Sequence, residues 1–371
     1  MAAPMLRVVA YVPYPLGTTP SQRFRLEQWA PILEGRGISM AFRPFATPEL
    51  VGRLYRQGLS FGKAWSLCRR TLARARELPQ PGEFDVAVVH RAMSLIGPAV
   101  LERRLARRVP LVYDFDDAIH LLHTSEANRA FGWLKFPGKT ADICALATGV
   151  TVGNEYLADF ARGHAKSVRV VPSSVDTDIY TPGPERRRFS PAVVGWMGSS
   201  TSQTYLEPFS PLLARLAAQG LVVRIVSDRK PDGFPFPFEW RAWSAETEVE
   251  DLRSFDIGIM PLPDTEWARG KCAMKILQYM GVGVPSVGSD LGGNRAVITD
   301  GLNGFLAGDE EDWVAKIQRL ASDAELARRL GTAGRATVLT RYSASVCAGV
   351  FGKALEAAAA EGRALGKGGP A

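Results

Sequence analysis

The stretch from Phe255 to Ser289 reads FDIGIMPLPDTEWARGKCAMKILQYMGVGVPSVGS and contains, in order, an apolar strand, a helix and a second apolar strand. Strands that are apolar throughout are typical of parallel sheets covered by helices on both faces. The order strand, helix, strand therefore predicts a parallel α/β sheet in this part of the chain.

The same alternation extends outward in both directions. Short valine-rich runs bounded by turn residues or charge predict further strands at residues 6–12, 84–90, 110–115, 149–153, 168–176, 192–198, 221–227 and 304–307. Helical stretches lie between them, among them residues 22–34 and 94–107. The sequence thus predicts an α/β protein with two Rossmann-like, doubly wound parallel-sheet domains.

The segment TPGPERRRFSPA, residues 181–192, has the proline, glycine and charge content of a linker. We therefore expect a first domain over residues 1–182, a linker over 183–192 and a second domain over 193–345. Residues 346–371 are expected to form a helix that packs back on the first domain, followed by a disordered tail. Within the second domain, Ser322 and Glu325 predict a capping box at the start of a helix that Gly331 ends.

The charge of the chain is uneven. Residues 1–110 carry 17 Lys and Arg against 7 Asp and Glu, whereas the rest carries 28 against 31. A basic half indicates either a polyanionic partner, such as a membrane surface, or a solvated arginine-rich face. The four cysteines are far apart, as in a protein with reduced thiols. No apolar run approaches the roughly 20 residues of a spanning helix. We expect a cytoplasmic protein, with the inner face of the membrane as a candidate surface.

Two lysines and an amide recur at helical spacing in KCAMKILQYMGVGVP. Lys271, Lys275 and Gln278 are separated by four and three residues, which would place them on one helix face. Free amides and the positive end of the helix dipole would add to Lys271, so the segment predicts a diphosphate site. The alternative is a solvated cationic face.

A glycine-rich loop follows the next predicted strand. Gly292 and Gly293 permit backbone amides to approach a ligand closely, and Asn294 offers both a donor and an acceptor. Open α/β sheets bind ligands at the carboxyl ends of their strands, where this loop lies.

Taken together, the segments DIGIMPL, ARGKCAMKILQYMGVGVPSV, GGN and DGLNGFLA resemble the donor domain of glycosyltransferase family four. The resemblance implies the GT-B fold, with two Rossmann-like domains, an active site in the cleft between them, a nucleotide-sugar donor and retention of configuration. It extends to VGWMGSSTSQTYL, which implies donor contacts by Gly198, Ser199, Ser200 and Thr201. The loop PLGTTPSQRFRLEQW is similar to the family loop that closes over donor and acceptor. That similarity implies donor contacts by Gly17 and Arg23 and acceptor contacts by Ser21 and Arg25.

One departure concerns the family's two glutamates. Gly270 stands at the position of the first and Gln278 at that of the second. A glutamine still hydrogen-bonds ribose hydroxyls, so we expect Gln278 to contact the donor, with Lys271 and Lys275 gripping its diphosphate.

Acidic residues follow the strand at residues 110–115. Asp116 stands where the family often has a histidine, and we expect Asp116 and Asp117 to act at the transferred sugar or the acceptor hydroxyl. His120 and His123 follow them, and Asn154 and Glu155 come after the next strand; we expect His120, Asn154 and Glu155 on the acceptor side. The rival interpretation is a divalent cation held by Asp114 and Asp116.

The sequence therefore predicts a retaining glycosyltransferase, with catalytic roles for Asp116, Asp117, Lys271 and Lys275. It would move a sugar from a nucleotide-sugar to a glycan, lipid-linked or small-molecule acceptor, in bacterial cell-surface polysaccharide or glycoconjugate synthesis, with no metal or other cofactor. A nucleotide-sugar epimerase of the same fold and a non-enzymatic basic binding protein are the alternatives, and we expect no nucleic-acid partner because stacking aromatics on a basic strand are lacking.

A basic amphipathic stretch supports a membrane partner. Its cations are interleaved with Leu54, Leu59, Trp65, Leu67 and Leu72, a composition suited to anionic lipid or to a solvated face. The cations are Arg53, Arg56, Lys63, Arg69, Arg70, Arg74 and Arg76.

Overall fold

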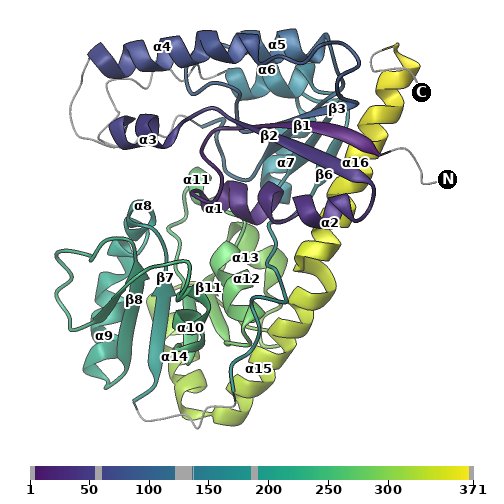
Figure 1. The fold of residues 1–371 in the computed structure, drawn as a ribbon. Coiled ribbons are helices and arrows are strands. Elements are labelled where there is room, and N and C mark those ends of the chain that lie inside the picture. The colour runs from purple at the N-terminus through teal and green to yellow at the C-terminus, as the bar shows by residue number, and fades with distance from the viewer. Residues whose placement is uncertain (1–4, 55–60, 122–135, 137, 185–190, 367–371) are drawn as a thin grey trace. The chain divides into compact units, whose positions relative to one another are not determined.

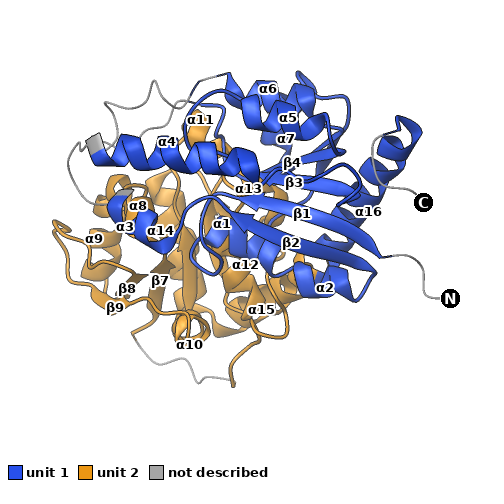
Figure 2. Ribbon diagram, turned by 45° about the horizontal axis from the view of Figure 1, so that its top comes forward, with its two compact units in different colours: residues 1–173, 345–371 blue, residues 174–344 orange. Residues whose placement is uncertain are grey.

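The computed structural model describes residues 5–54, 61–121, 136, 138–184 and 191–366. These residues form two compact units, each built on one six-stranded sheet (Figure 2). Unit 1 comprises residues 1–173 and 345–371, and unit 2 comprises residues 174–344. The predicted fold class is confirmed: both sheets are parallel and doubly wound. The domain and linker boundaries drawn from the sequence remain predictions, and most of the linker, residues 185–190, lies outside the described residues.

The sheet of unit 1 is parallel throughout, in the order β2-β1-β3-β4-β5-β6. The chain runs outward from β1 to β2 on one side and from β3 to β6 on the other, so the order reverses between β1 and β3. Such a reversal opens a crevice at the carboxyl ends of the two strands. The strands are β1 (Leu6–Val12), β2 (Ile38–Pro44), β3 (Val86–His90), β4 (Leu111–Phe115), β5 (Gly149–Val152) and β6 (Val168–Val170).

Helices of unit 1 follow the strands in the expected alternation (Figure 1). They are α1 (Pro20–Gln22), α2 (Ala30–Glu34), α3 (Pro48–Leu54), α4 (Phe61–Arg76), α5 (Val100–Ala106), α6 (Lys139–Leu146), α7 (Glu155–Arg162) and the long last helix α16 (Ala344–Ala364). All but the first residue of α16 belong to unit 1, where the ring of Phe351 packs 5.2 Å from that of Trp29.

Unit 2 repeats the architecture with the strand order β12-β11-β10-β7-β8-β9. Here the order reverses between β7 and β10, which are parallel neighbours. The strands are β7 (Val193–Met197), β8 (Val222–Ser227), β9 (Glu239–Ala242), β10 (Ile257–Met260), β11 (Ser286–Ser289) and β12 (Phe305–Ala307). Its α-helices are α8 (Ser200–Gln203), α9 (Ser210–Ala218), α10 (Glu248–Arg253), α11 (Glu266–Arg269), α12 (Met274–Gly281), α13 (Gly292–Val297), α14 (Glu310–Ser322) and α15 (Ala324–Thr337).

The central strands are buried along their whole length, which explains why they are apolar throughout. Every residue of β3, β4, β10 and β11 is buried. In unit 2 the sheet packs on aromatic and aliphatic side chains of α9, α14 and α15, including Leu213, Trp313 and Leu330. Within the described residues, no helix combines the length and the apolar character needed to cross a bilayer.

Several local predictions were wrong. The helix predicted over residues 22–34 is broken into α1, a π-helical turn Arg23–Glu27, and α2. The helix predicted over 94–107 begins only at Val100, and the strand predicted over 168–176 ends at Val170.

The predicted capping box also differs from the structure. Ser322 is the last residue of α14, and Asp323 caps α15 by accepting from the backbone amide of Leu326 at 2.9 Å. Gly331 lies inside α15 instead of ending it. A Cβ at Gly331 would clash with the carbonyl oxygen of Gly283, so close packing of two backbones explains this glycine.

Candidate functional site

In unit 2 the predicted donor residues gather at the reversal of strand order. The turn between α11 and α12 carries Lys271, and α12 carries Lys275. The Lys271 ammonium lies 5.7 Å from the centre of the Tyr205 ring, and the Lys275 ammonium lies 5.3 Å from that of Trp196 in β7. Both lysines are therefore held beside the segment that leaves β7, where open α/β sheets bind ligands.

The spacing predicts that Lys271 and Lys275 share one helix face, and this prediction is wrong. Helix α12 begins at Met274, after Ala273, whose φ of 54° is left-handed. This backbone conformation interrupts the helical path, so Lys271 precedes the helix. The Lys271 ammonium also lies 5.5 Å from the centre of the Trp267 ring in α11.

The glycine pair packs against the backbone of this turn. A Cβ on Gly293 would clash with the carbonyl oxygen of Lys271, and one on Gly292 would lie 2.9 Å from that of Arg269. Asn294 is wholly buried, and its Nδ2 donates to the Ser289 carbonyl at 3.0 Å. The glycines thus bring the start of α13 directly against the lysine turn, whereas Asn294 ties that start to β11.

The GSSTS segment after β7 is held by a residue that the sequence analysis missed. The Ser200 amide donates to Asp228 Oδ1 at 2.5 Å and its hydroxyl to Oδ2 at 2.8 Å. The Ser199 and Thr201 hydroxyls lie 2.9 Å apart. A Cβ on Gly198 would lie 2.6 Å from the Trp196 ring, so the turn is tight. Asp228 therefore accepts hydrogen bonds from the Ser200 amide and hydroxyl, two donors that we expected to bind a diphosphate.

Gln278 lies in a buried cluster of unit 2. Its side-chain amide donates to Glu248 Oε1 at 2.8 Å, and Tyr180 donates to the same oxygen. The indole of Trp243 donates to Oε2 at 2.9 Å. The contact of Gln278 with a donor ribose stays a prediction, because the described contacts of its amide are within the protein.

In unit 1 a set of buried charges lies where β1, β3 and β4 end. Arg25 and Asp114 form an ion pair at 2.6 Å with both side chains fully buried, and Arg25 also donates to the Val171 carbonyl. Thr151 donates to Asp114 Oδ1 at 2.6 Å. Asp114 is thus held by β5 and by the loop after β1 at once.

A histidine and an arginine from the end of β3 complete the set. His90 Nδ1 lies 2.8 Å from Asp114 Oδ2, and its Nε2 lies 3.0 Å from the Ser21 hydroxyl. That hydroxyl donates to Asp116 Oδ1 at 2.6 Å. We call Arg25, His90, Arg91, Asp114, Asp116 and Asp117, with the Ser21 hydroxyl that bridges two of them, the carboxylate network.

Arg91 joins Asp116 and Asp117, the two aspartates for which the sequence predicts catalytic roles. Its Nη2 donates to Asp116 Oδ1 at 2.8 Å and to Asp117 Oδ2 at 2.5 Å. Burial would raise the pKa of Asp116, but Arg91 and His90 hold that pKa well below its ordinary value. Burial would also raise the pKa of Asp114, but Arg25 and a hydrogen bond with His90 hold that pKa far below its ordinary value. Both carboxyl groups are therefore ionised at neutral pH.

Sequence reasoning missed His90, Arg91 and Thr151. Each lies at the carboxyl end of a predicted strand, which was the available signal. The register that pairs His90 with Asp114 depends on which strands are neighbours, and the sequence alone does not order the strands.

The remaining predicted residues of unit 1 have local roles. The Gly17 amide donates to Glu27 at 2.7 Å, and the Arg23 guanidinium lies 4.6 Å from the centre of the Phe24 ring. Asn154 Oδ1 caps α7 by accepting from the Leu157 amide.

Two more predicted acceptor residues lie at α7. His120 stacks on Phe160 of α7, with ring centres 3.9 Å apart. Glu155 forms an exposed ion pair with Arg162 at 2.9 Å. His123 lies outside the described residues. The acceptor role of these side chains stays a prediction.

The rival metal interpretation requires both Asp114 and Asp116 as cation ligands. Their carboxylates are instead engaged by arginines, His90 and hydroxyls. Among the described residues, no group of three or more His, Cys, Asp or Glu side chains is arranged to hold a metal ion.

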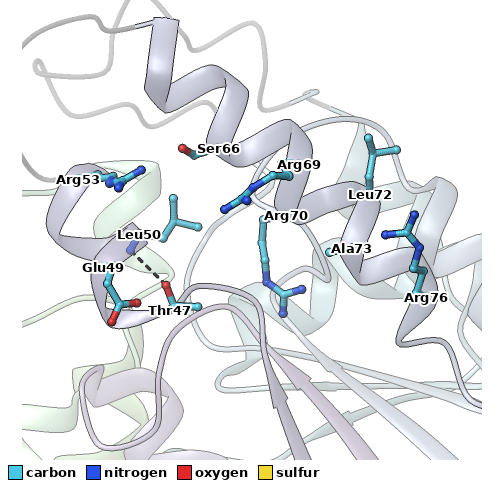
Figure 3. A pocket seen from close by; sticks show the side chains of 10 residues that line it. All are labelled: Thr47, Glu49, Leu50, Arg53, Ser66, Arg69, Arg70, Leu72, Ala73 and Arg76. Carbon is cyan, nitrogen blue, oxygen red and sulfur yellow. Dashed lines mark hydrogen bonds between the residues drawn. The ribbon is translucent and has the colours of Figure 1, made fainter.

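Helices α3 and α4 enclose a basic pocket of about 720 Å³ (Figure 3). The guanidinium groups of Arg53 and Arg69 extend into the space between the two helices. Trp65 and Leu72 on α4 are 66% and 70% exposed. Two of the predicted surface cations face inward: Arg70 pairs with Glu77 at 2.6 Å, and Arg74, whose pKa burial lowers to about 10, is buried. Arg56 and Leu59 lie outside the described residues.

Comparison with known proteins gives concordant matches. Residues 239–323 match the family model described as Glycosyl transferases group 1. The chain is similar to a D-inositol 3-phosphate glycosyltransferase of Stackebrandtia nassauensis, with 26% identity over 341 residues that cover 81% of this chain and 76% of the relative.

Solved structures resemble the fold over nearly the whole chain. A sucrose-phosphate synthase from Thermosynechococcus elongatus superposes with a TM-score of 0.68 at 14% identity, covering 95% of this chain and 98% of the other. The Anabaena protein Alr3699/HepE, in complex with UDP and glucose, gives 0.65 at 15% identity and covers 95% and 99%.

Proposed function

We propose that this chain, a glycosyltransferase with the GT-B fold that matches the group 1 family model over residues 239–323, transfers a sugar from a nucleotide-sugar donor with retention of configuration. The observation that carries the proposal is the convergence of Lys271, Lys275 and the glycine pair beside the end of β7. The two ammonium groups can pair with the negative charges of a diphosphate, and the tight turns allow backbone amides to approach its oxygens.

In the proposed reaction, the acceptor oxygen bonds to the anomeric carbon on the face from which the diphosphate departs. The bond between the anomeric carbon and the phosphate oxygen breaks, and the diphosphate takes the acceptor proton. Lys271 and Lys275 stabilise the charge that grows on the leaving oxygen. Asp116, through its ionised carboxylate, and Asp117, which shares the guanidinium of Arg91 with it, orient the acceptor or sugar hydroxyls.

We propose that the acceptor is a glycan, a lipid-linked sugar or a small phosphorylated molecule in bacterial surface polysaccharide or glycoconjugate synthesis. The name of the Stackebrandtia relative refers to an inositol phosphate, which supports an anionic acceptor. The exposed Trp65, Leu72 and Arg69 on α4 support docking on anionic lipid at the cytoplasmic face of the membrane.

A thermal-shift screen of the full chain with UDP, GDP, ADP and dTDP sugars tests the donor proposal. We expect one nucleotide class to raise the melting temperature, as binding to the native state requires. If none of these sugars shifts the transition at millimolar concentration, the donor proposal fails. Transfer with the donor so found, followed by NMR of the anomeric proton of the product, tests retention.

Two controls separate the proposal from its alternatives. Incubation with donor alone would yield an isomeric nucleotide-sugar if the protein were an epimerase. Because lysines supply the charge for the diphosphate, we propose that no metal is needed, and transfer should be unchanged after treatment with EDTA.

A further inference from the structure

The hydrogen bonds around His90 fix where its protons lie. The Ser21 hydroxyl has a single proton, which it donates to Asp116 Oδ1 at 2.6 Å. The same oxygen lies 3.0 Å from His90 Nε2 and must accept there, so Nε2 carries a proton. On the other side of the ring, Nδ1 lies 2.8 Å from Asp114 Oδ2, an ionised carboxylate that only accepts. Both ring nitrogens therefore act as donors.

The charges of the carboxylate network agree with this assignment. Three carboxylates, Asp114, Asp116 and Asp117, face two guanidinium groups, those of Arg25 and Arg91. A doubly protonated His90 adds a positive charge directly beside Asp114 and, through Ser21, close to Asp116. The interaction with these ionised carboxylates offsets the cost of burying a charged imidazole between Asp114 and Ser21.

The two carboxylates at the ends of this chain of hydrogen bonds are held by different partners. Asp114 lies in β4 and is held by Arg25 and Thr151 as well as by His90. Ser21 belongs to the loop and short helix after β1, and Asp116 lies one residue beyond the end of β4. His90, at the end of β3, thus connects a carboxylate inside the sheet to the Asp116 carboxylate, which the Ser21 hydroxyl and Arg91 hold together.

We propose that His90 is a positioning residue that donates from both ring nitrogens and, through the Ser21 hydroxyl, fixes the Asp116 carboxylate in the orientation that meets the acceptor. The inference about acceptor orientation rests on the proposed transferase function, whereas the protons on His90 do not. His90 itself contacts no substrate in this scheme. Its contribution reaches the acceptor hydroxyl through Ser21 and Asp116.

The first test needs no activity. In a ¹H–¹⁵N spectrum of the histidine rings of the full chain, we expect one of the four histidines to show both nitrogens protonated at neutral pH. Its signals should disappear in His90→Asn, which assigns them. In Ser21→Ala the Nε2 proton should exchange faster with water, because its acceptor is lost. A neutral, singly protonated His90 ring in the wild type would overturn the proposal.

The second test compares two hydroxyl deletions in the same network. Ser21→Ala breaks the connection to Asp116, whereas Thr151→Val removes a bond to Asp114 and leaves that connection in place. We expect Ser21→Ala to lower kcat and raise the acceptor KM, together on the order of tenfold to a hundredfold, with the donor-induced thermal shift unchanged. Thr151→Val should lower the melting temperature more than it affects turnover.

Equal turnover of Ser21→Ala and wild type would refute the positioning role. If no acceptor supports transfer by the wild type, the transferase proposal fails instead, and the ring spectrum still decides the state of His90.

Discussion

The ammonium of Lys275 lies 5.3 Å from the centre of the Trp196 ring, which joins the start of α12 to strand β7 across 79 residues of sequence. Trp196 is almost wholly buried, so it provides a rigid apolar platform for the cation. A lysine held in this way loses little conformational freedom when an anion binds, which favours its use as a fixed charge at a diphosphate.

Removal of either cation should reduce transfer with little effect on folding. We expect Lys271→Ala and Lys275→Ala each to lower kcat roughly 10²- to 10³-fold, by loss of charge stabilisation on the leaving group. The loss of a cation–π contact should cost at most about 1 kcal/mol of stability. Lys353→Ala on the exposed surface of α16 removes the same charge and serves as the control. Near-normal turnover of both site variants would contradict the donor site.

A side chain at Gly293 should destabilise the protein and weaken donor binding. In Gly293→Ala the new Cβ meets the Lys271 carbonyl, so the turn must shift, at a cost of about 1–3 kcal/mol in the free energy of unfolding. Donor affinity should fall as Lys271 moves. Gly308→Ala, where no atom lies within 4 Å of the added Cβ, is the matched control. Urea denaturation and donor titration measure the two effects, and equal stability of the two variants would argue against the close packing.

The buried pair of Arg25 and Asp114 should make unit 1 sensitive to acid. The pKa of Asp114 is depressed in the folded state, so its contribution is complete above the unfolded pKa of about 4 and is lost progressively as pH falls below it. Asp114→Asn should lower the free energy of unfolding at neutral pH by about 3–5 kcal/mol, because Arg25 is left buried without its counterion. Denaturation between pH 3 and 7 should also show a shallower acid dependence in the variant. If the free energy of unfolding fell equally steeply with pH in Asp114→Asn and the wild type, Asp114 would not be the source of the acid sensitivity.

Helix α4 should mediate binding to anionic vesicles. We expect the double variant Arg69→Gln, Arg76→Gln to weaken sedimentation with phosphatidylserine vesicles at low salt by roughly 30-fold, from about 1 kcal/mol per cation. Arg103→Gln, Arg104→Gln on α5 removes the same charge from another exposed surface. Equal losses in the two double variants would show that net charge, and not α4, drives the binding.

The apolar strands of both sheets could be predicted because a strand buried on both faces leaves a continuous apolar run in the sequence. Two of the four edge strands leave no such run. β2 is partly exposed along most of its length and β9 is mostly exposed, and neither was predicted. The break before α12 also gave no signal, because its left-handed residue is Ala273 and not a glycine.

The candidate site was predictable only in part, for a related reason. Candidate residues that lie in one segment, such as Lys271, Lys275 and the glycine pair, could be named from local sequence. Asp228 and His90 enter through hydrogen bonds to segments 28 and 69 residues away. These contacts follow from the order of strands in the sheet, which spacing along the chain does not reveal.

The packing of α16 on unit 1 has a consequence for how the protein is made. Phe351 and Leu355 are fully buried, and Gly352 lies against Leu33 and Ile38, near the beginning of the chain. A ribosome therefore completes the whole of unit 2 before it supplies the residues that close the core of unit 1. Until α16 is synthesised, the core of unit 1 lacks Phe351 and Leu355, so we expect unit 1 to complete its packing only after unit 2 has been made.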